Sequence, residues 1–173
     1  MKDWDFAGLA MADAARAPWL DSFFLAITWL GSLAVLLPLA LLVWWQQGDR
    51  KAGFVALALI SSSALVHAVK LIAVRPRPEF FPPLIEMPGD ASFPSAHAMQ
   101  ATAFALAWLM QPGKSPGIVE SAILLSVVAL VGMSRLYLQV HFPSDVVVGV
   151  IFAALWVLFL RKLLAWRGVN SET

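Results

Sequence analysis

The chain has 173 residues, of which 60% are hydrophobic and only 13% charged, and its formal net charge is +1. This composition excludes an ordinary soluble domain and indicates one domain, residues 1–173, embedded in a membrane. No basic run points to a nucleic-acid partner. Because the chain has no cysteine, disulfides, thiolate metal sites and thiol catalysis are excluded.

Residues 1–20 mix charged side chains with tryptophan, phenylalanine and leucine. At helical spacing this segment is either an interfacial amphipathic helix or a polar leader. It lacks the basic and apolar regions of a cleaved signal peptide, so we expect the later helices to drive membrane insertion.

Five apolar segments follow, each about twenty residues long, which is enough for a helix to cross a bilayer. The first is expected to bend at Gly31 or Pro38. A proline-rich stretch that begins at Arg75 lacks periodicity and predicts a functional loop. Pro94 is expected to open the third segment, with Ser92 as its cap. The predicted spans are residues 22–45, 52–74, 94–110, 118–137 and 143–166.

These segments predict an all-α integral membrane bundle of about five transmembrane helices, with an interfacial helix before them. Because consecutive spans cross the bilayer in opposite directions, alternate junctions share a side. One face therefore collects polar residues that are distant in sequence: Lys70, Arg77, Ser95, His97, Arg135, His141 and Asp145. The positive-inside rule places this face outside the cytoplasm, because the opposite face carries Arg50, Lys51, Lys114, Arg161, Lys162 and Arg167.

The cations of this cluster, Lys70, Arg77 and Arg135, suit a phosphate or a similar anion. The free N-terminal amides of the third and fifth spans are expected to point at the same anion. The sequence has no paired carboxylates and no histidine-rich spacing of a metal site, which argues against a metal hydrolase. The cluster therefore predicts an anion site that uses no cofactor.

Two histidines give the cluster reactivity. His141 precedes the fifth span, and Asp145 can reach it across the first helical turn, which leaves the other ring nitrogen free as a nucleophile. His97 lies in the first turn of the third span and can protonate a leaving oxygen. Together these groups match covalent phosphoryl transfer.

Each residue also has a simpler explanation. A histidine at a helix end is often a hydrogen-bonded structural group, Lys70 can extend to lipid headgroups, and Arg135 can bind lipid phosphate passively. An anionic-lipid binder or a transporter would need the same cations but no nucleophile or acid, so the histidines with Asp145 favour an enzyme. His67 either lines the site or, as we expect, has a structural role. Three acidic residues are interpreted as solvated loop charges: Glu79, Glu86 and Asp90.

Three motifs carry a family resemblance. Lys70 to Pro78 reads K-x6-R-P, Pro94 to His97 reads P-S-x-H, and Ser134 to Asp145 reads S-R-x5-H-x3-D. In this order they resemble the three-part signature of the type 2 phosphatidic acid phosphatase superfamily of membrane lipid phosphatases. The resemblance implies that His141 is the nucleophile, Asp145 its partner and His97 the general acid. It also implies a phosphate site made by Lys70, Arg77, Ser95, Ala96 and Arg135, in which Ala96 replaces a frequent glycine.

The family also includes soluble acid phosphatases and vanadate-dependent haloperoxidases, but the membrane spans argue against both. A short chain with an outward-facing site resembles bacterial enzymes that act on undecaprenyl diphosphate or phosphatidylglycerophosphate. We predict undecaprenyl diphosphate as the substrate, hydrolysed through a phosphohistidine in the bacterial cytoplasmic membrane. Phosphatidic acid and lipid A phosphates are the alternatives, and the sequence does not indicate an oligomeric state.

Overall fold

The computed structural model describes residues 3–47, 50–111 and 113–170, and every regular element among them is helical. The all-α class is therefore confirmed. The elements are α1 (Asp3–Ala14), α2 (Pro18–Ile27), the 3-10 turn η1 (Thr28–Gly31), α3 (Leu33–Gln47), α4 (Arg50–Ala73), α5 (Ala96–Leu109), α6 (Ile118–Tyr137) and α7 (Pro143–Asn170).

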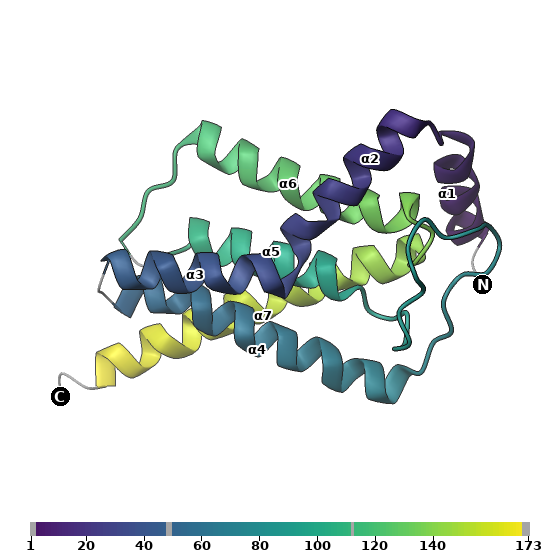
Figure 1. Ribbon diagram of the computed structural model, residues 1–173. Coiled ribbons are helices and arrows are strands. Elements are labelled where there is room, and N and C mark those ends of the chain that lie inside the picture. The colour runs from purple at the N-terminus through teal and green to yellow at the C-terminus, as the bar shows by residue number, and fades with distance from the viewer. Residues whose placement is uncertain (1–2, 48–49, 112, 171–173) are drawn as a thin grey trace.

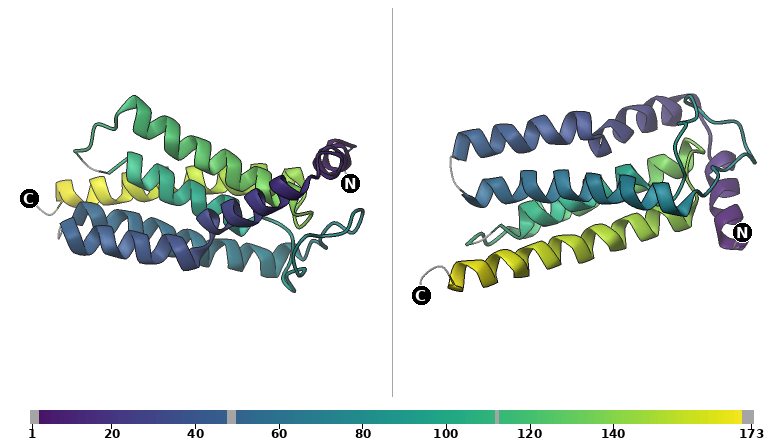
Figure 2. Two further views of the ribbon diagram at one scale, coloured as in Figure 1. Left: turned by 45° about the horizontal axis from the view of Figure 1, so that its top comes forward. Right: turned by 90° about the horizontal axis from the view of Figure 1, so that it is seen from below.

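Helix α5 occupies the centre of the bundle, and α3, α4, α6 and α7 pack around it along its length (Figures 1 and 2). Its surface is rich in alanine, and these small side chains let neighbouring helices approach closely. The helix is buried on most sides, including Ala98, Met99, Ala101, Ala103, Ala105 and Ala107. The core of the molecule therefore surrounds the helix that carries the P-S-x-H motif.

Among the described residues, three helices are long and apolar enough to cross a membrane: Gly53–Ala73, Ile118–Tyr137 and Pro143–Ala165. A fourth span results if Pro18–Gly31 and Leu33–Gln46 are taken together, and these two are bent by 49°. Helix α5 has 14 residues and is roughly 21 Å long, shorter than a hydrocarbon core of about 30 Å. The prediction of about five spans is thus approximate, because the third predicted span is a short helix enclosed by the others.

The first predicted span, residues 22–45, is divided between α2, η1 and α3. The helix is interrupted at Gly31 and Ser32, whereas Pro38 lies within α3. Glycine is required at the break, because a Cβ on Gly31 would lie 2.5 Å from a methyl group of Val131 and 3.1 Å from the carbonyl oxygen of His97. The break thus lets η1 pack directly on α5 and α6.

The N-terminal segment forms two helices, because α1 ends at Ala14 and α2 begins with Pro18 at its first position. Helix α1 lies across one end of the bundle (Figures 1 and 2). Its arrangement is inverted relative to a soluble helix: Asp5 is buried, whereas Trp4 and Phe6 are exposed. An orientation across the bundle end, with aromatic side chains outward, fits a helix at a membrane interface.

Candidate active site

The site lies at the end of the bundle where α4 and α6 end and α5 and α7 begin (Figure 1). A cavity of about 320 Å³ opens there. Its walls include six of the predicted residues: Lys70, Arg77, Ala96, His97, Arg135 and His141. Ser95 and Asp145 are fully buried beside these residues in the first turns of α5 and α7.

The opposite end of the bundle carries Lys114, in the α5–α6 loop, and Arg161 and Lys162, near the end of α7. The side chains of Arg50, Lys51 and Arg167 lie outside the described part of the chain.

Backbone carbonyls and one hydroxyl group accept hydrogen bonds from the cationic side chains. Lys70 donates from Nζ to the carbonyl of Ala91, and Arg77 donates from Nη1 to the carbonyl of Val140 at 2.6 Å. Arg135 donates from Nη1 to Oγ1 of Thr28 in η1 at 2.5 Å. Each cation is therefore oriented without a bound anion being needed.

Two buried polar atoms at the site have no hydrogen-bond partner among the described residues. They are Nε of Arg135 and Oγ of Ser95. Buried polar atoms are normally paired, so each such atom in a native structure calls for an explanation. Two donors beside a cationic cavity fit the oxygens of a phosphate.

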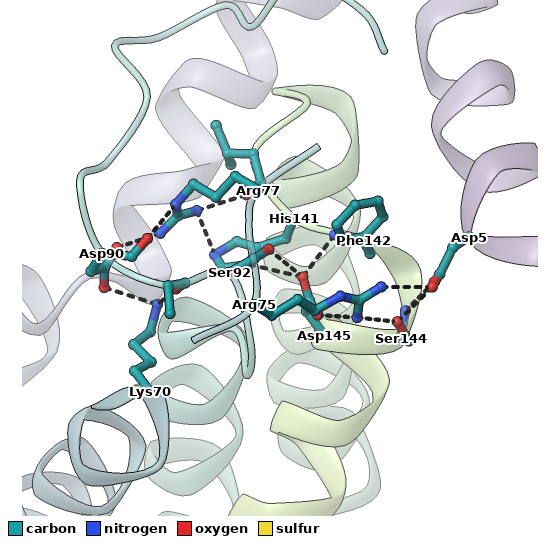
Figure 3. Close-up of polar contacts among 12 residues, drawn as sticks. Asp5, Lys70, Arg75, Arg77, Asp90, Ser92, His141, Phe142, Ser144 and Asp145 are labelled. Carbon is teal, nitrogen blue, oxygen red and sulfur yellow. Dashed lines mark hydrogen bonds and ion pairs between the residues drawn. The ribbon is translucent and has the colours of Figure 1, made fainter. Parts of the chain in front are cut away.

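One side of the His141 ring faces Asp145 and Ser92, and the other side faces Arg77 (Figure 3). Nδ1 lies 3.5 Å from Oδ2 of Asp145 and 3.4 Å from Oγ of Ser92. Nε2 lies 3.4 Å from Nη1 of Arg77, on the cavity side. Burial lowers the pKa of His141 below its ordinary value and thereby favours the neutral ring that a nucleophile requires.

Asp90 is more than the solvated loop charge that the sequence predicted, although its side chain is 46% exposed. Its carboxylate forms ion pairs with Lys70, at 2.8 Å, and with Arg77 (Figure 3). Partial burial opposes ionisation, but the hydrogen bonds from both cations outweigh it and lower the pKa of Asp90 to about 2. Asp90 belongs to an aperiodic loop, so no sequence pattern relates it to the cations.

Ser92 also differs from its prediction. Helix α5 begins at Ala96, with Ser95 as the N-cap residue, so Pro94 does not open the helix and Ser92 does not cap it. The hydroxyl of Ser92 instead donates to Oδ2 of Asp145 at 2.5 Å. Ser92 therefore supports the aspartate that faces His141.

The amides of α7 are not available to an anion, contrary to expectation. The amide of Phe142 donates to Oδ2 of Asp145, and that of Ser144 donates to Oδ1 of Asp5, both at 2.9 Å. Two carboxylates thus already occupy this helix start. The α5 start differs, because Ala96 lines the cavity and Ser95 makes no side-chain cap.

Arg75 is a residue of the site that the sequence analysis missed. Its guanidinium donates from Nη1 to Oδ1 of Asp145 at 2.6 Å and from Nη2 to Oδ2 of Asp5 at 2.9 Å. The repeat R-P-R-P contained a signal, since it places two arginines in one loop, but the motif assigns a role only to Arg77. Asp5 lies far from every motif in the sequence.

His67 lies on the cavity wall, where the sequence favoured a purely structural role. Nδ1 donates to the carbonyl of Ser63 at 2.7 Å, which leaves Nε2 as the second ring nitrogen. In the described part of the chain, no three His, Cys, Asp or Glu side chains are grouped as a metal site would require.

Comparison with known families decides between the classes of protein that such a site allows. A family model described as the PAP2 superfamily matches residues 51–168. The chain belongs to the PAP2 superfamily. The resemblance carried by the three motifs is thereby confirmed, and the chain is a membrane phosphatase that acts on phosphate esters. The PAP2 region comprises α4 to α7, whereas α1 to α3 precede it.

Similar proteins include several bacterial PAP2-type lipid phosphatases. Phosphatidylglycerophosphatase B of Bacillus subtilis is 34% identical over 148 residues, 78% of this chain and 70% of that protein. The putative undecaprenyl-diphosphatase YbjG of Escherichia coli is 31% identical, over 95% of this chain and 82% of that protein. A decaprenylphosphoryl-5-phosphoribose phosphatase of Mycobacterium tuberculosis is 40% identical over 53% of this chain and 49% of that protein.

Two solved structures share the PAP2 fold seen here. Aquifex aeolicus LpxE superposes with a TM-score of 0.78 at 29% identity, over 89% of this chain and 92% of that one. The PAP2-type phosphatidylglycerolphosphate phosphatase of Bacillus subtilis gives 0.79 at 29% identity, over 94% and 85% respectively. The coverage shows that the likeness extends beyond the family model into the N-terminal helices.

Proposed function

We propose that this PAP2 protein hydrolyses a lipid phosphate or diphosphate through a phosphohistidine on His141. The observation that carries the proposal is the orientation of the His141 ring (Figure 3). Its Nδ1 side faces Asp145 and Ser92, and its Nε2 side faces a cavity lined by cations. A neutral imidazole placed in this way can attack a phosphorus atom bound in the cavity.

In the first step a bond forms between Nε2 of His141 and phosphorus as the bond from phosphorus to the lipid-side oxygen breaks. His97 gives that oxygen a proton, so the lipid leaves as an alcohol or as a monophosphate. Asp145 stabilises the positive charge that develops on the His141 ring. Water then attacks the phosphohistidine, returns a proton to His97 and releases inorganic phosphate.

The charge on the transferred phosphoryl group is matched by Lys70, Arg77 and Arg135. The unpaired Ser95 hydroxyl and Arg135 Nε provide further donors. Ala96 begins α5 beside the cavity, where free first-turn amides favour an anion. No step requires a metal ion, so we expect full activity in the presence of a chelator and inhibition by vanadate.

An apolar groove beside the phosphate cavity supports a lipid as the leaving group. Helices α3 and α6 flank a cavity of about 180 Å³ above α5, and a second cavity of about 460 Å³ continues toward the far end of the bundle. Leu39, Phe104 and Leu124 line both. The groove begins next to Ser32 and Leu33, which line the phosphate cavity. An apolar chain fits the two cavities of this groove, which share part of their lining.

We favour undecaprenyl diphosphate as the substrate. Beyond the cations, the phosphate cavity also has polar walls from Ser32, His67 and Gln100. These polar groups provide hydrogen-bonding partners for a second phosphate group, as a diphosphate headgroup has. The likeness to YbjG along 95% of this chain supports the same choice, while the likeness to phosphatidylglycerophosphatase B makes phosphatidylglycerophosphate the second candidate.

Phosphate release by the purified protein from a panel of lipids in matched detergent tests this proposal. We expect the highest kcat/KM with undecaprenyl diphosphate, then phosphatidylglycerophosphate, phosphatidic acid and lipid A. The His67→Ala variant should lose activity on the diphosphate more than on phosphatidic acid. Hydrolysis of a soluble nitrophenyl phosphate but of none of the lipids would contradict the proposal.

We also propose that the site faces the outside of the cytoplasmic membrane, because Lys114, Arg161 and Lys162 lie at the other end of the bundle. Cysteines placed at Gly89 and at Ser115 in separate variants should be labelled from outside and from inside, respectively. Labelling of the Ser115 position by an impermeant reagent in intact cells would contradict this orientation.

A further inference from the structure

A buried ionic bridge connects the N-terminal helix to the aspartate of the active site (Figure 3). Asp5 of α1 is 1% exposed and Asp145 of α7 is 0% exposed, and the guanidinium of Arg75 lies between them. Burying two carboxylates is costly unless each is paired and hydrogen-bonded. One arginine here pairs with two carboxylates, one of which faces the proposed nucleophile.

The bridge determines how the Asp145 carboxylate is oriented. Its Oδ1 accepts from Arg75 at 2.6 Å, so that its Oδ2 accepts from Ser92 and from the amide of Phe142 and faces His141. Arg75 is itself fixed by the ring of Phe142, whose centroid lies 4.1 Å from the guanidinium carbon. Rotation of the carboxylate would break these contacts together.

Asp5 holds the other side of Arg75. Its Oδ2 accepts from Arg75 Nη2 and from the hydroxyl of Ser144, both at 2.9 Å, and its Oδ1 accepts from the Ser144 amide. Helix α1 is seated closely enough for this contact because it has Gly8 next to Pro143, where a Cβ would come within 2.6 Å. Asp5 is thus fixed against the first turn of α7.

We propose that Asp5 is a positioning residue for the phosphatase reaction, acting through Arg75 on Asp145. Asp5 competes with Asp145 for the positive charge of Arg75 and so leaves Asp145 more negative charge with which to stabilise the His141 ring. This role rests on the proposed function of His141. It makes the N-terminal helix, which lies outside the region matched by the family model, a functional part of the active site.

Asp5 and Arg75 have opposite charges, so removing one or the other has opposite electrostatic effects on His141. Removing the Asp5 charge makes the surroundings of His141 more positive and lowers the pKa of its ring. Removing the Arg75 charge raises it. The other ionisable groups that face the site are unchanged in either variant: Lys70 from α4, Arg77 and Asp90 from the loop, His97 from α5 and Arg135 from α6.

The test compares Asp5→Asn, Arg75→Met and the double variant, each as the purified full chain, by measuring kcat/KM for nitrophenyl phosphate against pH. The acid limb should move to lower pH in Asp5→Asn and to higher pH in Arg75→Met, each by roughly one pH unit or less. The double variant should return toward the wild-type limb. Arg75→Lys keeps the charge and should leave the limb in place.

Asp13→Asn is the matched control, because Asp13 is on the same helix but, among the residues that the structure describes, pairs only with Arg16. We expect Asp5→Asn to lower kcat about ten-fold with KM nearly unchanged, as for a group that acts on the transition state, and Asp13→Asn to change neither. An unshifted limb in both bridge variants, or a shift in the same direction, would overturn the proposal. If the wild type forms no phosphohistidine, the proposed function fails instead, whatever the bridge variants do.

Discussion

The PAP2 region and the N-terminal region contribute to the site in different ways. Helices α4 to α7 and their loops carry every residue that the motifs assign to chemistry. Helices α1 to α3 carry none of them, yet Thr28 holds Arg135, Gly31 packs against the backbone of His97, and Asp5 holds Arg75. The reacting groups thus come from one region, and part of their orientation comes from the other.

Residues that react and residues that orient them are subject to different requirements. A reacting group needs a given chemical type at a given point of a helix, which is visible as a short motif. A residue that orients it needs only to reach it in space, so it can come from any segment that packs nearby. Variants in the PAP2 region and in the N-terminal region should therefore differ in the size and in the kind of their effects.

The largest effect among these variants is expected for His97 in the PAP2 region. His97→Ala removes the proton donor for the leaving oxygen, which typically costs about 10²–10⁴-fold in rate. A nitrophenyl leaving group needs no proton, so this variant should recover much of its activity on nitrophenyl phosphate. Rates on a lipid phosphate and on nitrophenyl phosphate measure the recovery. Equal losses on both substrates would show that His97 is not the acid.

A smaller effect is expected for Thr28 in the N-terminal region. Thr28→Val removes the hydroxyl that accepts from Arg135 Nη1, and a hydrogen bond to a charged group contributes about 1.5–3 kcal/mol. Vanadate should therefore bind roughly ten-fold more weakly. Thr102→Val is the control, since that hydroxyl donates to the carbonyl of Ala98 within α5. Equal vanadate inhibition constants in the wild type and in Thr28→Val would show that η1 does not help to orient Arg135 in the site.

Gly31→Ala should affect the thermal stability of the protein more than its catalytic rate. The added methyl group would meet Val131 and the His97 backbone, and overpacking of this kind typically costs about 1–3 kcal/mol. Thermal unfolding in detergent should show a lower Tm than for the wild type. Gly117→Ala is the control, because a Cβ there has nothing within 4 Å. An unchanged Tm in Gly31→Ala would indicate that the break between η1 and α3 adapts freely.

The smallest effect is expected for Asp90, which pairs with two cations of the site. Asp90→Asn removes a negative charge from Lys70 and Arg77, while backbone carbonyls still hold both cations. Inorganic phosphate should inhibit this variant a few-fold more strongly than the wild type. Weaker inhibition would mean that Asp90 orients the cations rather than offsetting their charge.

The Asp90 carboxylate also affects the pH dependence of stability and of activity. The pKa of Asp90 in the folded protein, about 2, lies below the ordinary pKa of an aspartate because Lys70 and Arg77 donate hydrogen bonds to its carboxylate. The ion pairs of Asp90 therefore contribute stability above the unfolded pKa, and this contribution is lost as the pH falls through about 2. Asp90 is ionised near neutral pH and pairs with Arg77, which lies beside His141, so Asp90→Asn makes the surroundings of His141 more positive and should move the acid limb to lower pH.

Much of the site could be predicted from the sequence, because membrane spans restrict the possible arrangements. Once the apolar segments are taken to cross a bilayer, the ends of α4 and α6 and the starts of α5 and α7 must meet. Lys70, His97, Arg135 and His141 follow from their places in these segments. Helix formation and hydrophobic length, both local properties, were sufficient for this step.

The remaining features depend on contacts that no local pattern encodes. The partners Asp5 and Arg75 are separated by 70 residues, and Asp90 reaches its cations from a loop without periodicity. Ser92 lies two residues before Pro94 and therefore has the pattern of a helix cap, but the helix begins at Ala96 and the Ser92 hydroxyl donates to Asp145. The sequence likewise could not indicate that carboxylates occupy the start of α7.

The central claim is that His141 carries the phosphoryl group, and trapping of the phosphoenzyme tests it most directly. The purified protein is mixed with a ³²P-labelled lipid phosphate, quenched in alkali within one turnover, and analysed for acid-labile label on histidine. The account predicts labelled His141 in the wild type, no label and no turnover in His141→Ala, and orders-of-magnitude slower labelling in Asp145→Asn. A phosphoenzyme in His141→Ala, or turnover by that variant at the wild-type rate, would contradict it.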